Sequence, residues 1–286
     1  MTIGALRAAG VQLLRQHGVE SPELDASLLL AHLLQKDRTW LVLNQDQIVE
    51  SSVEEQYLSL ISQRTAGLSV AYITGFKEFM GLEFSVNSAV LVPRPDTEIL
   101  VEKALEWLNN KASYPSGPPK VLDLCTGSGC IGISLAYYHP ELDLTLSDIS
   151  KEALAVSKNN AERLFGAKRA ASVRLVHSDL LDFFLHQHEQ FDLIVSNPPY
   201  IPRRIIPDLP REVRQEPLLA LDGGEDGLDL IRRLINGAQA LLKDKGAIFI
   251  ESDSEQILSI QELLKNNGFH AIESYPDLSG SLRCTR

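Results

Sequence analysis

Apolar residues in the first 66 positions recur at the spacing of amphipathic helices. The leucines that share two such faces are Leu6, Leu13, Leu14, Leu24, Leu28, Leu29 and Leu33. The segment Ser21-Pro22-Glu23 has the composition of a helix start, because a hydroxyl residue precedes a proline and a carboxylate. The spacing predicts a small N-terminal helical bundle over residues 1–68.

The pattern changes between Val70 and Val92 to short runs typical of β-strands. These runs read VAYITG, EFSVN and AVLVP, and Gly75, Gly81 and Asn87 separate them. Runs rich in β-branched and aromatic residues favour strands when turn residues bound them. We predict a β-hairpin linker over residues 69–92.

Helical and strand-like patterns alternate over residues 93–286. The first helix lies in PRPDTEILVEKALEWL, where Asp96 or Thr97 can act as the cap, and a polar loop follows over 109–120. The predicted strands are Val121–Leu124, Leu142–Leu146, Val173–Val176, Phe191–Val195 and Ala247–Glu251. The predicted helices are Ile131–Tyr138, Lys151–Leu164, Leu228–Leu242 and Glu255–Asn266.

This alternation predicts an α/β domain over residues 93–286. Strands joined by right-handed helical crossovers form a parallel sheet that is covered on both faces, as in Rossmann-like folds. The closing GFHAIESYPDLSGSLRCTR adds two short strands that can form an antiparallel edge. In open sheets of this kind, ligands bind beyond the carboxyl ends of the strands.

Composition narrows the class of protein. Hydrophobic residues make up 44% of the 286 residues and the mean hydropathy is −0.05, as in globular proteins with a sizeable core. No apolar run reaches the roughly 18 residues of a membrane span, and no signal-peptide pattern opens the chain. The spacing of the three cysteines, Cys125, Cys130 and Cys284, fits neither a zinc site nor a disulfide framework. The net charge of −11 argues against a surface that binds nucleic acid. We expect a cytoplasmic monomer with no metal, no membrane contact and no stable nucleic-acid partner.

A glycine-rich segment follows the first predicted strand of the sheet. Residues Gly127-Ser128-Gly129-Cys130-Ile131-Gly132 match the pattern G-x-G-x-x-G, between a strand and a helix. Asp148 ends the next strand, about 20 residues after Gly129, where an acidic group can hold ribose hydroxyls. We predict an adenosine-containing cofactor at this loop. The alternative is a glycine turn that only packs the helix closely against the sheet.

Asp123 distinguishes between cofactors, because it lies at the carboxyl end of the first sheet strand. A carboxylate there would repel the pyrophosphate of a dinucleotide, whereas S-adenosylmethionine has no phosphate and carries a cationic amino group and a sulfonium. We therefore predict S-adenosylmethionine as the cofactor, with Asp123 among its contacts. Asp179, after the third strand, either accepts from the adenine amino group or caps a helix that begins near Leu180.

The strand Phe191–Val195 leads into Asn197-Pro198-Pro199-Tyr200, four residues that a strand does not need. The prolines stiffen the loop and offer no N–H groups, so the Asn197 side-chain oxygen and the Pro198 carbonyl are presented as acceptors for an NH₂ group. An amide or aromatic amine is a poor nucleophile, so its methylation requires alignment and stabilisation of positive charge on nitrogen. We predict that these four residues are catalytic, with Tyr200 covering the planar acceptor group.

Several separated segments resemble one known family. DLCTGSG, SNPPYIP, GLEFSVNSAVLVPRPDTEILVE, EPLLALDGGEDGLDLIRRLI and GFHAIESYPDLSGSLR are similar to the HemK/PrmC family of release-factor glutamine methyltransferases, and the resemblance covers nearly the whole chain. It implies a class I S-adenosylmethionine-dependent methyltransferase domain. It also implies methyl transfer to the N5 amide of the glutamine in the Gly-Gly-Gln motif of peptide-chain release factors, with the helical domain docking this protein partner.

The resemblance assigns roles by matching position. It implies that Thr126-Gly127-Ser128-Gly129 holds the methionine portion of the cofactor, Asp148 the ribose, and Asp179 with Leu180 the adenine. Asn197–Tyr200 would grip the glutamine, with Asn197 also reaching the cofactor. The PRPDTE segment would line the entrance of the active site.

The sequence departs from the family pattern at two places. Cys125 stands where many relatives have glycine, which strains the backbone if its φ angle is positive. Ser252-Asp253 replaces an apolar residue and a glycine, which puts the local geometry in question. The segment 201–227 is long for a connection in a compact domain, and we predict that it binds substrate.

Other functions share parts of these motifs. A nucleic-acid amine methyltransferase of the adenine-N6 type would use the same Asn-Pro-Pro-Tyr chemistry, but would carry a basic face or a target-recognition domain. A ribosomal-protein glutamine methyltransferase would differ in the PRPDTE segment. An NAD-dependent oxidoreductase leaves Asp123 and Asn197 unexplained, and a scaffold protein on a degenerate Rossmann-like domain would be indifferent to substitution of Asn197.

Overall fold

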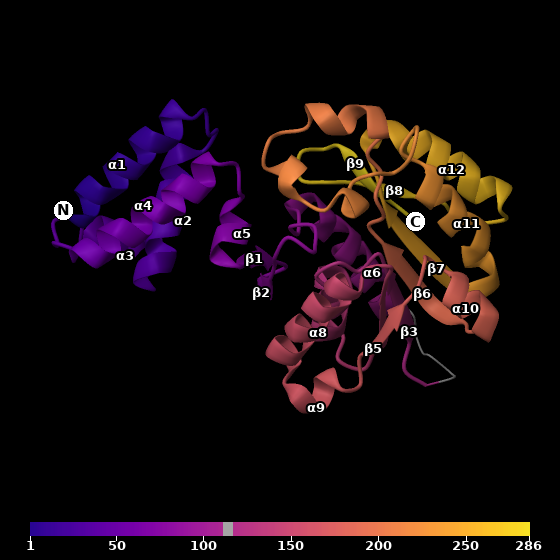
Figure 1. The fold of residues 1–286 in the computed structure, drawn as a ribbon. Helices are drawn as coiled ribbons and strands as arrows, with labels where there is room; N and C mark the ends of the chain where they lie inside the picture. The colour runs from indigo at the N-terminus through magenta and orange to yellow at the C-terminus, as the bar shows by residue number, and fades with distance from the viewer. Residues whose placement is uncertain (111–116) are drawn as a thin grey trace. The chain divides into compact units, whose positions relative to one another are not determined.

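The computed structural model describes residues 1–110 and 117–286 (Figure 1). The chain forms two compact units, one of Met1–Phe76 with Pro210–Gln215 and one of Lys77–Leu209 with Glu216–Arg286. The segment 210–215 thus belongs to the N-terminal unit, although it lies inside the loop predicted to bind substrate. The predicted loop over 109–120 falls partly outside the described residues, and the domain limits predicted at 68 and 92 stay predictions.

The N-terminal unit is helical, as predicted. Its helices are α1 (Ile3–Gln16), α2 (Pro22–Leu34), α3 (Arg38–Leu43), α4 (Ser51–Thr65) and α5 (Val70–Thr74). Their apolar faces meet in one core around the buried Tyr57, whose hydroxyl donates to the Ala26 carbonyl at 3.1 Å. The buried Arg64 pairs with Asp25 at 2.7 Å and with Glu212 at 2.9 Å, so an ion pair ties the segment 210–215 to this unit.

The prediction of a strand at VAYITG is wrong, because these residues form α5. The side chain of Ser69 accepts from the Tyr72 N–H at 3.2 Å, and Gly75 ends the helix with φ +80°. Both helix ends are therefore capped within a few residues, which outweighs the β-propensity of the valine, tyrosine and isoleucine between them.

The predicted hairpin is present but shorter. It consists of β1 (Phe76–Phe79) and β2 (Leu82–Ser85), joined at Met80 and Gly81, which both have positive φ angles. The run AVLVP forms no strand, so that part of the prediction is wrong. The caps predicted for the following helix are also absent: a 3₁₀ turn, η1 (Pro95–Thr97), precedes α6 (Glu98–Asn110) without a side-chain cap.

The second unit contains a mainly parallel sheet of seven strands. They are β3 (Lys120–Leu124), β4 (Asp143–Asp148), β5 (Arg174–His177), β6 (Phe191–Ser196), β7 (Leu242–Glu251), β8 (Ser274–Pro276) and β9 (Leu282–Thr285). Their order is β5-β4-β3-β6-β7-β9-β8, and only the pairs that involve β9 are antiparallel. The predicted parallel sheet with an antiparallel edge is therefore confirmed.

Helices cover both faces of this sheet. Besides α6, they are α7 (Cys130–Tyr138), α8 (Lys151–Phe165), α9 (Ala167–Ala170), α10 (Asp182–Gln187), α11 (Asp229–Leu241) and α12 (Ile257–Asn266). One apolar core joins α6, α7 and α8 to the sheet, and a second joins α10, α11 and α12, which lie together on one side in Figure 1. Every residue of β6 is buried, as expected for a central strand covered on both faces. Within the described ranges, no helix is long and apolar enough to span a membrane.

Candidate active site

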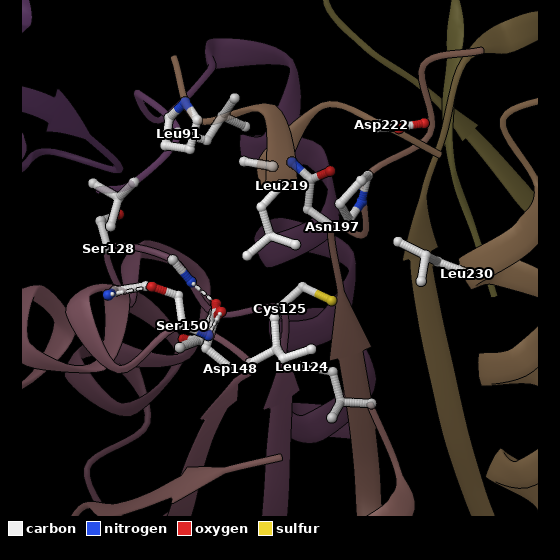
Figure 2. A pocket seen from close by; sticks show the side chains of 18 of the residues that line it. Leu91, Leu124, Cys125, Ser128, Asp148, Ser150, Asn197, Leu219, Asp222 and Leu230 are labelled. Atoms are coloured by element: carbon white, nitrogen blue, oxygen red, sulfur yellow. Dashed lines mark hydrogen bonds between the residues drawn. The ribbon is translucent and has the colours of Figure 1, made fainter. Parts of the chain in front are cut away.

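The cavity of the second unit lies where the direction of strand order reverses. β3 and β6 are neighbours, and the connections that flank them run to opposite faces of the sheet. Such a switch point leaves a crevice at the carboxyl ends of the strands. A cavity of about 930 Å³ is present there. In Figure 2, Asp148 and Ser150 lie on one side of it and Leu230 on the other, with Cys125 and Asn197 between them.

The three glycines of the predicted loop have different surroundings. A Cβ on Gly129 would lie 2.6 Å from Ile133 Cδ1, and one on Gly132 would lie 2.5 Å from Leu146 Cδ2. A Cβ on Gly127 would meet no atom within 4 Å, although its φ angle of +53° favours glycine. Two glycines therefore allow close packing of α7, and Gly127 leaves open space where a ligand can approach the backbone.

Asp148 organises the glycine loop from the end of β4. Its Oδ2 accepts from the Gly127 N–H and its Oδ1 from the Ser150 N–H, both at 2.9 Å. Burial raises the pKa of Asp148, while these hydrogen bonds oppose the shift. Because a carboxylate oxygen accepts more than one hydrogen bond, Asp148 keeps acceptor capacity toward the cavity that it lines.

Asp123 lies behind the loop and is not among the residues that line the cavity. It is fully buried, and its Oδ2 accepts from the Thr126 hydroxyl at 2.6 Å and from the Gly132 N–H at 3.0 Å. Its Oδ1 has no hydrogen-bond partner among the described residues. Burial raises the pKa of Asp123 to about 7. This carboxyl group therefore shapes the loop and remains protonated below neutral pH.

The raised pKa of Asp123 predicts a pH-dependent stability. The unfolded chain releases this proton near the ordinary pKa of 3.8, whereas the folded chain keeps it up to about 7. The free energy of unfolding should therefore fall as pH rises through that window, and Asp123→Asn should flatten the slope. Urea unfolding of both proteins at pH 5 and pH 8 measures this difference. If the free energy of unfolding changed equally with pH in both proteins, Asp123 would have the same pKa in the folded and the unfolded chain.

Cys125 lies in the left-handed region of the Ramachandran plot, with a φ angle of +57°. The backbone is therefore strained at this position, where many relatives have glycine. Cys125→Gly should be more stable than Cys125→Ala by about 1 kcal/mol, because only glycine adopts this conformation without strain. The alanine variant controls for loss of the sulfur. Urea unfolding of the two variants tests this, and an alanine variant as stable as the glycine variant would contradict it.

Thr126 and Ser128 hold the loop by further contacts. The Thr126 N–H donates to the Ser147 carbonyl at 3.0 Å, and the Ser128 carbonyl accepts from Asn160 Nδ2 at 2.9 Å. Asn160 also exchanges two hydrogen bonds with the backbone of Ser85, so it links α8 and the hairpin to the glycine loop. The Ser128 hydroxyl is buried and has no partner among the described residues, and Ser128 lines the cavity.

Asp179 and Leu180 line the cavity at the end of β5. The following helix, α10, begins after Leu181 without a side-chain cap, and its Phe183 N–H donates to the Ser178 hydroxyl at 3.2 Å, so the Asp179 side chain does not cap it. Asp179 instead pairs with Arg233 of α11 at 2.9 Å. Leu180 is buried with φ +47°, an uncommon conformation for leucine, and strain of this kind is concentrated at binding sites.

Asn197 reaches the cavity from the end of β6. Its Nδ2 donates to the Thr97 hydroxyl at 3.3 Å, and its Oδ1 accepts no hydrogen bond from the described part of the chain. Pro199 also lines the cavity, whereas the buried Pro198 and the half-buried Tyr200 do not. The Tyr200 hydroxyl lies 3.4 Å from Glu251 Oε1.

The Tyr200 backbone is held from behind by close neighbours. Gln256 Nε2 donates to the Tyr200 carbonyl at 2.9 Å, and a Cβ on Gly227 would lie 2.2 Å from that same oxygen. Gln256 belongs to a capping box with Asp253, whose φ angle of −67° suits any residue. The departure at Ser252-Asp253 therefore leaves the local geometry intact, because Asp253 acts as a helix cap where a glycine was expected.

Sequence patterns missed three parts of this site. Thr97 was predicted as one of two possible helix caps and as part of the PRPDTE segment at the entrance, but its hydrogen bond from Asn197 was not foreseen. Arg233 reaches the cavity from the middle of α11. Leu218 and Leu219 are 60% and 55% exposed and also line the cavity. The segment 201–227 had been predicted to bind substrate, but no residue within it had been singled out. The signal available in the sequence was the pair of adjacent leucines within a long loop between a strand and a helix.

Fold and site together define the class of protein. An open, mainly parallel α/β sheet with a glycine loop, an acidic second strand end and Asn-Pro-Pro-Tyr at the switch point belongs to class I methyltransferases. Residues 101–205 match the family described as methyltransferase small domain. The solved structure of a methyltransferase from Pyrococcus furiosus superposes with TM-score 0.50 and 18% identity, covering 80% of this chain and 94% of that chain.

Residues 5–75 match the family described as PrmC N-terminal domain. The release factor glutamine methyltransferase of Clostridium acetobutylicum is 42% identical over 258 residues, covering 89% of this chain and 87% of the relative. That of Moorella thermoacetica is 39% identical over 285 residues, covering 99% of this chain and 97% of the relative. The chain belongs to the release factor glutamine methyltransferase family.

Proposed function

We propose that this protein transfers a methyl group from S-adenosylmethionine to the side-chain amide of the glutamine in the Gly-Gly-Gln motif of peptide-chain release factors. The main support within the site is the state of Asn197. Its NH₂ group is engaged by Thr97 while its oxygen remains available at the cavity, which suits an incoming amide NH₂. Membership of the family supplies the particular acceptor.

The residues of the cavity fit S-adenosylmethionine. The open space at Gly127 admits the methionine portion next to Thr126, Ser128 and Gly129, and the spare acceptor capacity of Asp148 suits the ribose hydroxyls. Asp179 and the buried Leu180 would hold the adenine. The acidic groups near this cavity favour a cationic cofactor over one with phosphates.

The role of Asp123 is then indirect. Because it is buried behind the loop, it would hold Thr126 and Gly132 in place and contribute to cofactor binding through them. Because Asp123 does not line the cavity, we assign it to maintaining the shape of the glycine loop.

When bound, S-adenosylmethionine would supply a methyl group from a positively charged sulfur; the sulfur would leave as a neutral thioether, and the methylated nitrogen would release one proton to solvent. Asn197 Oδ1, which is available at the cavity, would align the glutamine NH₂ and stabilise positive charge on its nitrogen. Pro199 keeps this loop rigid, since proline has a fixed φ angle. Leu218 and Leu219 would help to exclude water from the cavity that they line.

The test is methyl transfer from labelled S-adenosylmethionine to a purified release factor, beside its Gly-Gly-Gln Gln→Ala variant and a duplex DNA. Label on the wild-type factor alone is expected. Label on DNA alone would replace the proposal with a nucleic-acid amine methyltransferase. Label on neither, with S-adenosylmethionine bound, would point to another protein substrate. We further propose that the protein acts in the cytoplasm, as a monomer, where release factors work.

A further inference from the structure

Glu251 is a buried carboxyl group beneath the Asn-Pro-Pro-Tyr segment, and it has no role in the proposal above. It ends β7 with a side chain that is almost fully buried. Its Oε1 lies 3.4 Å from the Tyr200 hydroxyl, and its Oε2 has no hydrogen-bond partner among the described residues. Burying a carboxyl group with an unsatisfied oxygen destabilises a fold, so a group of this kind suggests a functional reason.

Thr97 connects Glu251 to Asn197. The threonine is 2% exposed, and its Oγ1 accepts from Asn197 Nδ2 at 3.3 Å. The Thr97 side chain also lies near enough to Glu251 to favour its charged form and so to lower its pKa. The path from Asn197 to Tyr200 thus consists of the Asn197–Thr97 and Tyr200–Glu251 hydrogen bonds, with Thr97 close to Glu251 between them.

The charge of Glu251 determines the direction of hydrogen bonding along this path. A carboxylate only accepts, so the Tyr200 hydroxyl donates to it and the nearby Thr97 hydroxyl can only turn its proton toward it. The Thr97 oxygen is then left to accept, which engages the NH₂ group of Asn197 and turns its oxygen toward the cavity. A protonated Glu251 can donate instead, and the Thr97 proton is then free to turn toward an Asn197 amide in the opposite orientation.

We propose that Glu251 is a positioning residue for methyl transfer, which through Thr97 and Tyr200 holds Asn197 with its oxygen toward the glutamine. This inference rests on the proposed function, since it explains how Asn197 is kept ready to accept from an amide NH₂. Glu251 would touch neither the glutamine nor the cofactor.

Several charged or titratable groups face Glu251. They are Arg283 and Cys284 on β9, Asp96 on η1, Cys130 on α7 and Tyr200 after β6. Burial raises the pKa of Glu251 to about 7, Asp96 adds to the rise, and Arg283 opposes it. The ionised, active form is therefore present above about pH 7 and is lost as the pH falls through it.

The kinetic test is Glu251→Gln, with Glu262→Gln on the exposed face of α12 as the matched control. Glu251→Gln should lower kcat by about ten- to a hundredfold, with little change in KM for either substrate, because misorientation affects the reacting geometry. The wild-type and control kcat should rise through about pH 7, and the variant should lack this rise. A wild-type kcat in Glu251→Gln, or an unchanged pH profile, would overturn the proposal.

Thr97 supplies an independent test of the same path. Thr97→Val removes the hydroxyl at similar size and should reproduce the loss in kcat, whereas Thr97→Ser should recover most of it. The double variant Glu251→Gln/Thr97→Val should be no slower than the slower single variant, because both changes break one path. Additive losses, or losses in kcat matched by losses in thermal stability, would assign these residues a structural role only.

A measurement without turnover separates this inference from the proposed function. The ¹⁵N side-chain amide signal of Asn197, assigned by its absence in Asn197→Ala, should shift through about pH 7 in the wild type and stay constant in Glu251→Gln. If this titration occurs and the wild type methylates no release factor, the proposed acceptor is wrong and the positioning stands. If the factor is methylated and the Asn197 signal does not titrate, the positioning is wrong.

Discussion

Asn197→Ala is expected to lower kcat for methyl transfer by about 100- to 1,000-fold, the usual effect of removing one positioned polar group at the reacting atoms. The side chain offers its oxygen to the cavity while Thr97 engages its NH₂ group, so alanine removes the acceptor that aligns the glutamine. Binding of S-adenosylmethionine should change little, because the glycine loop and Asp148 lie on another part of the cavity wall. Single-turnover kinetics with labelled cofactor and calorimetric titration measure the two effects separately.

The matched control is Asn266→Ala, which removes an exposed asparagine at the end of α12 without a side-chain hydrogen bond to the described residues. It should behave as the wild type in both measurements. Wild-type kcat in Asn197→Ala would refute the amide grip, and equal losses of kcat and cofactor affinity would indicate collapse of the cavity.

Asp148→Ala should weaken binding of S-adenosylmethionine by about 100-fold, or about 3 kcal/mol. The substitution removes acceptors for ribose hydroxyls and also leaves the Gly127 and Ser150 N–H groups without their partner. The glycine loop would then lose its preorganised shape, and the cofactor would have to order it on binding. Calorimetric titration gives the dissociation constant directly.

Asp143→Ala is the control for this second change. Asp143 is exposed at the opposite end of the same strand, far along β4 from the cavity, and Ala at that position should leave the dissociation constant unaltered. Unchanged affinity in Asp148→Ala would mean that the cofactor does not use the end of β4, and would revive the interpretation of the glycines as packing residues only.

Features that depend on short stretches of sequence were predictable. The glycine loop, the acidic end of β4 and the Asn-Pro-Pro-Tyr segment each combine residue types whose conformational or chemical limits act locally. The alternation of strand and helix patterns then determined the parallel sheet, because crossovers have one hand and place the carboxyl ends of the strands at one edge. The fold class and the position of the cavity follow from these facts.

Local patterns failed where a partner distant in sequence decided the outcome. Val70–Thr74 is the exception, since the caps that make it helical, Ser69 and Gly75, are its neighbours in sequence and were outweighed in the prediction by strand propensity. Asp179 pairs with Arg233 on another helix, and the segment 210–215 joins a unit more than 130 residues earlier in the chain through Glu212 and Arg64. A side chain selects the best available partner in space, and sequence distance does not enter that choice.

The sequence by itself determined which chemical groups this protein has and at which edge of the sheet they gather. Only the tertiary structure decided which of them face the cavity. Asp123 is excluded from it by burial behind the loop, whereas Thr97 is brought to Asn197 and Glu251 to Tyr200 from distant parts of the sequence. The physical reason is that hydrogen bonding and desolvation depend on which groups the packed chain places within about 3 Å of each other, and this is a property of the whole fold.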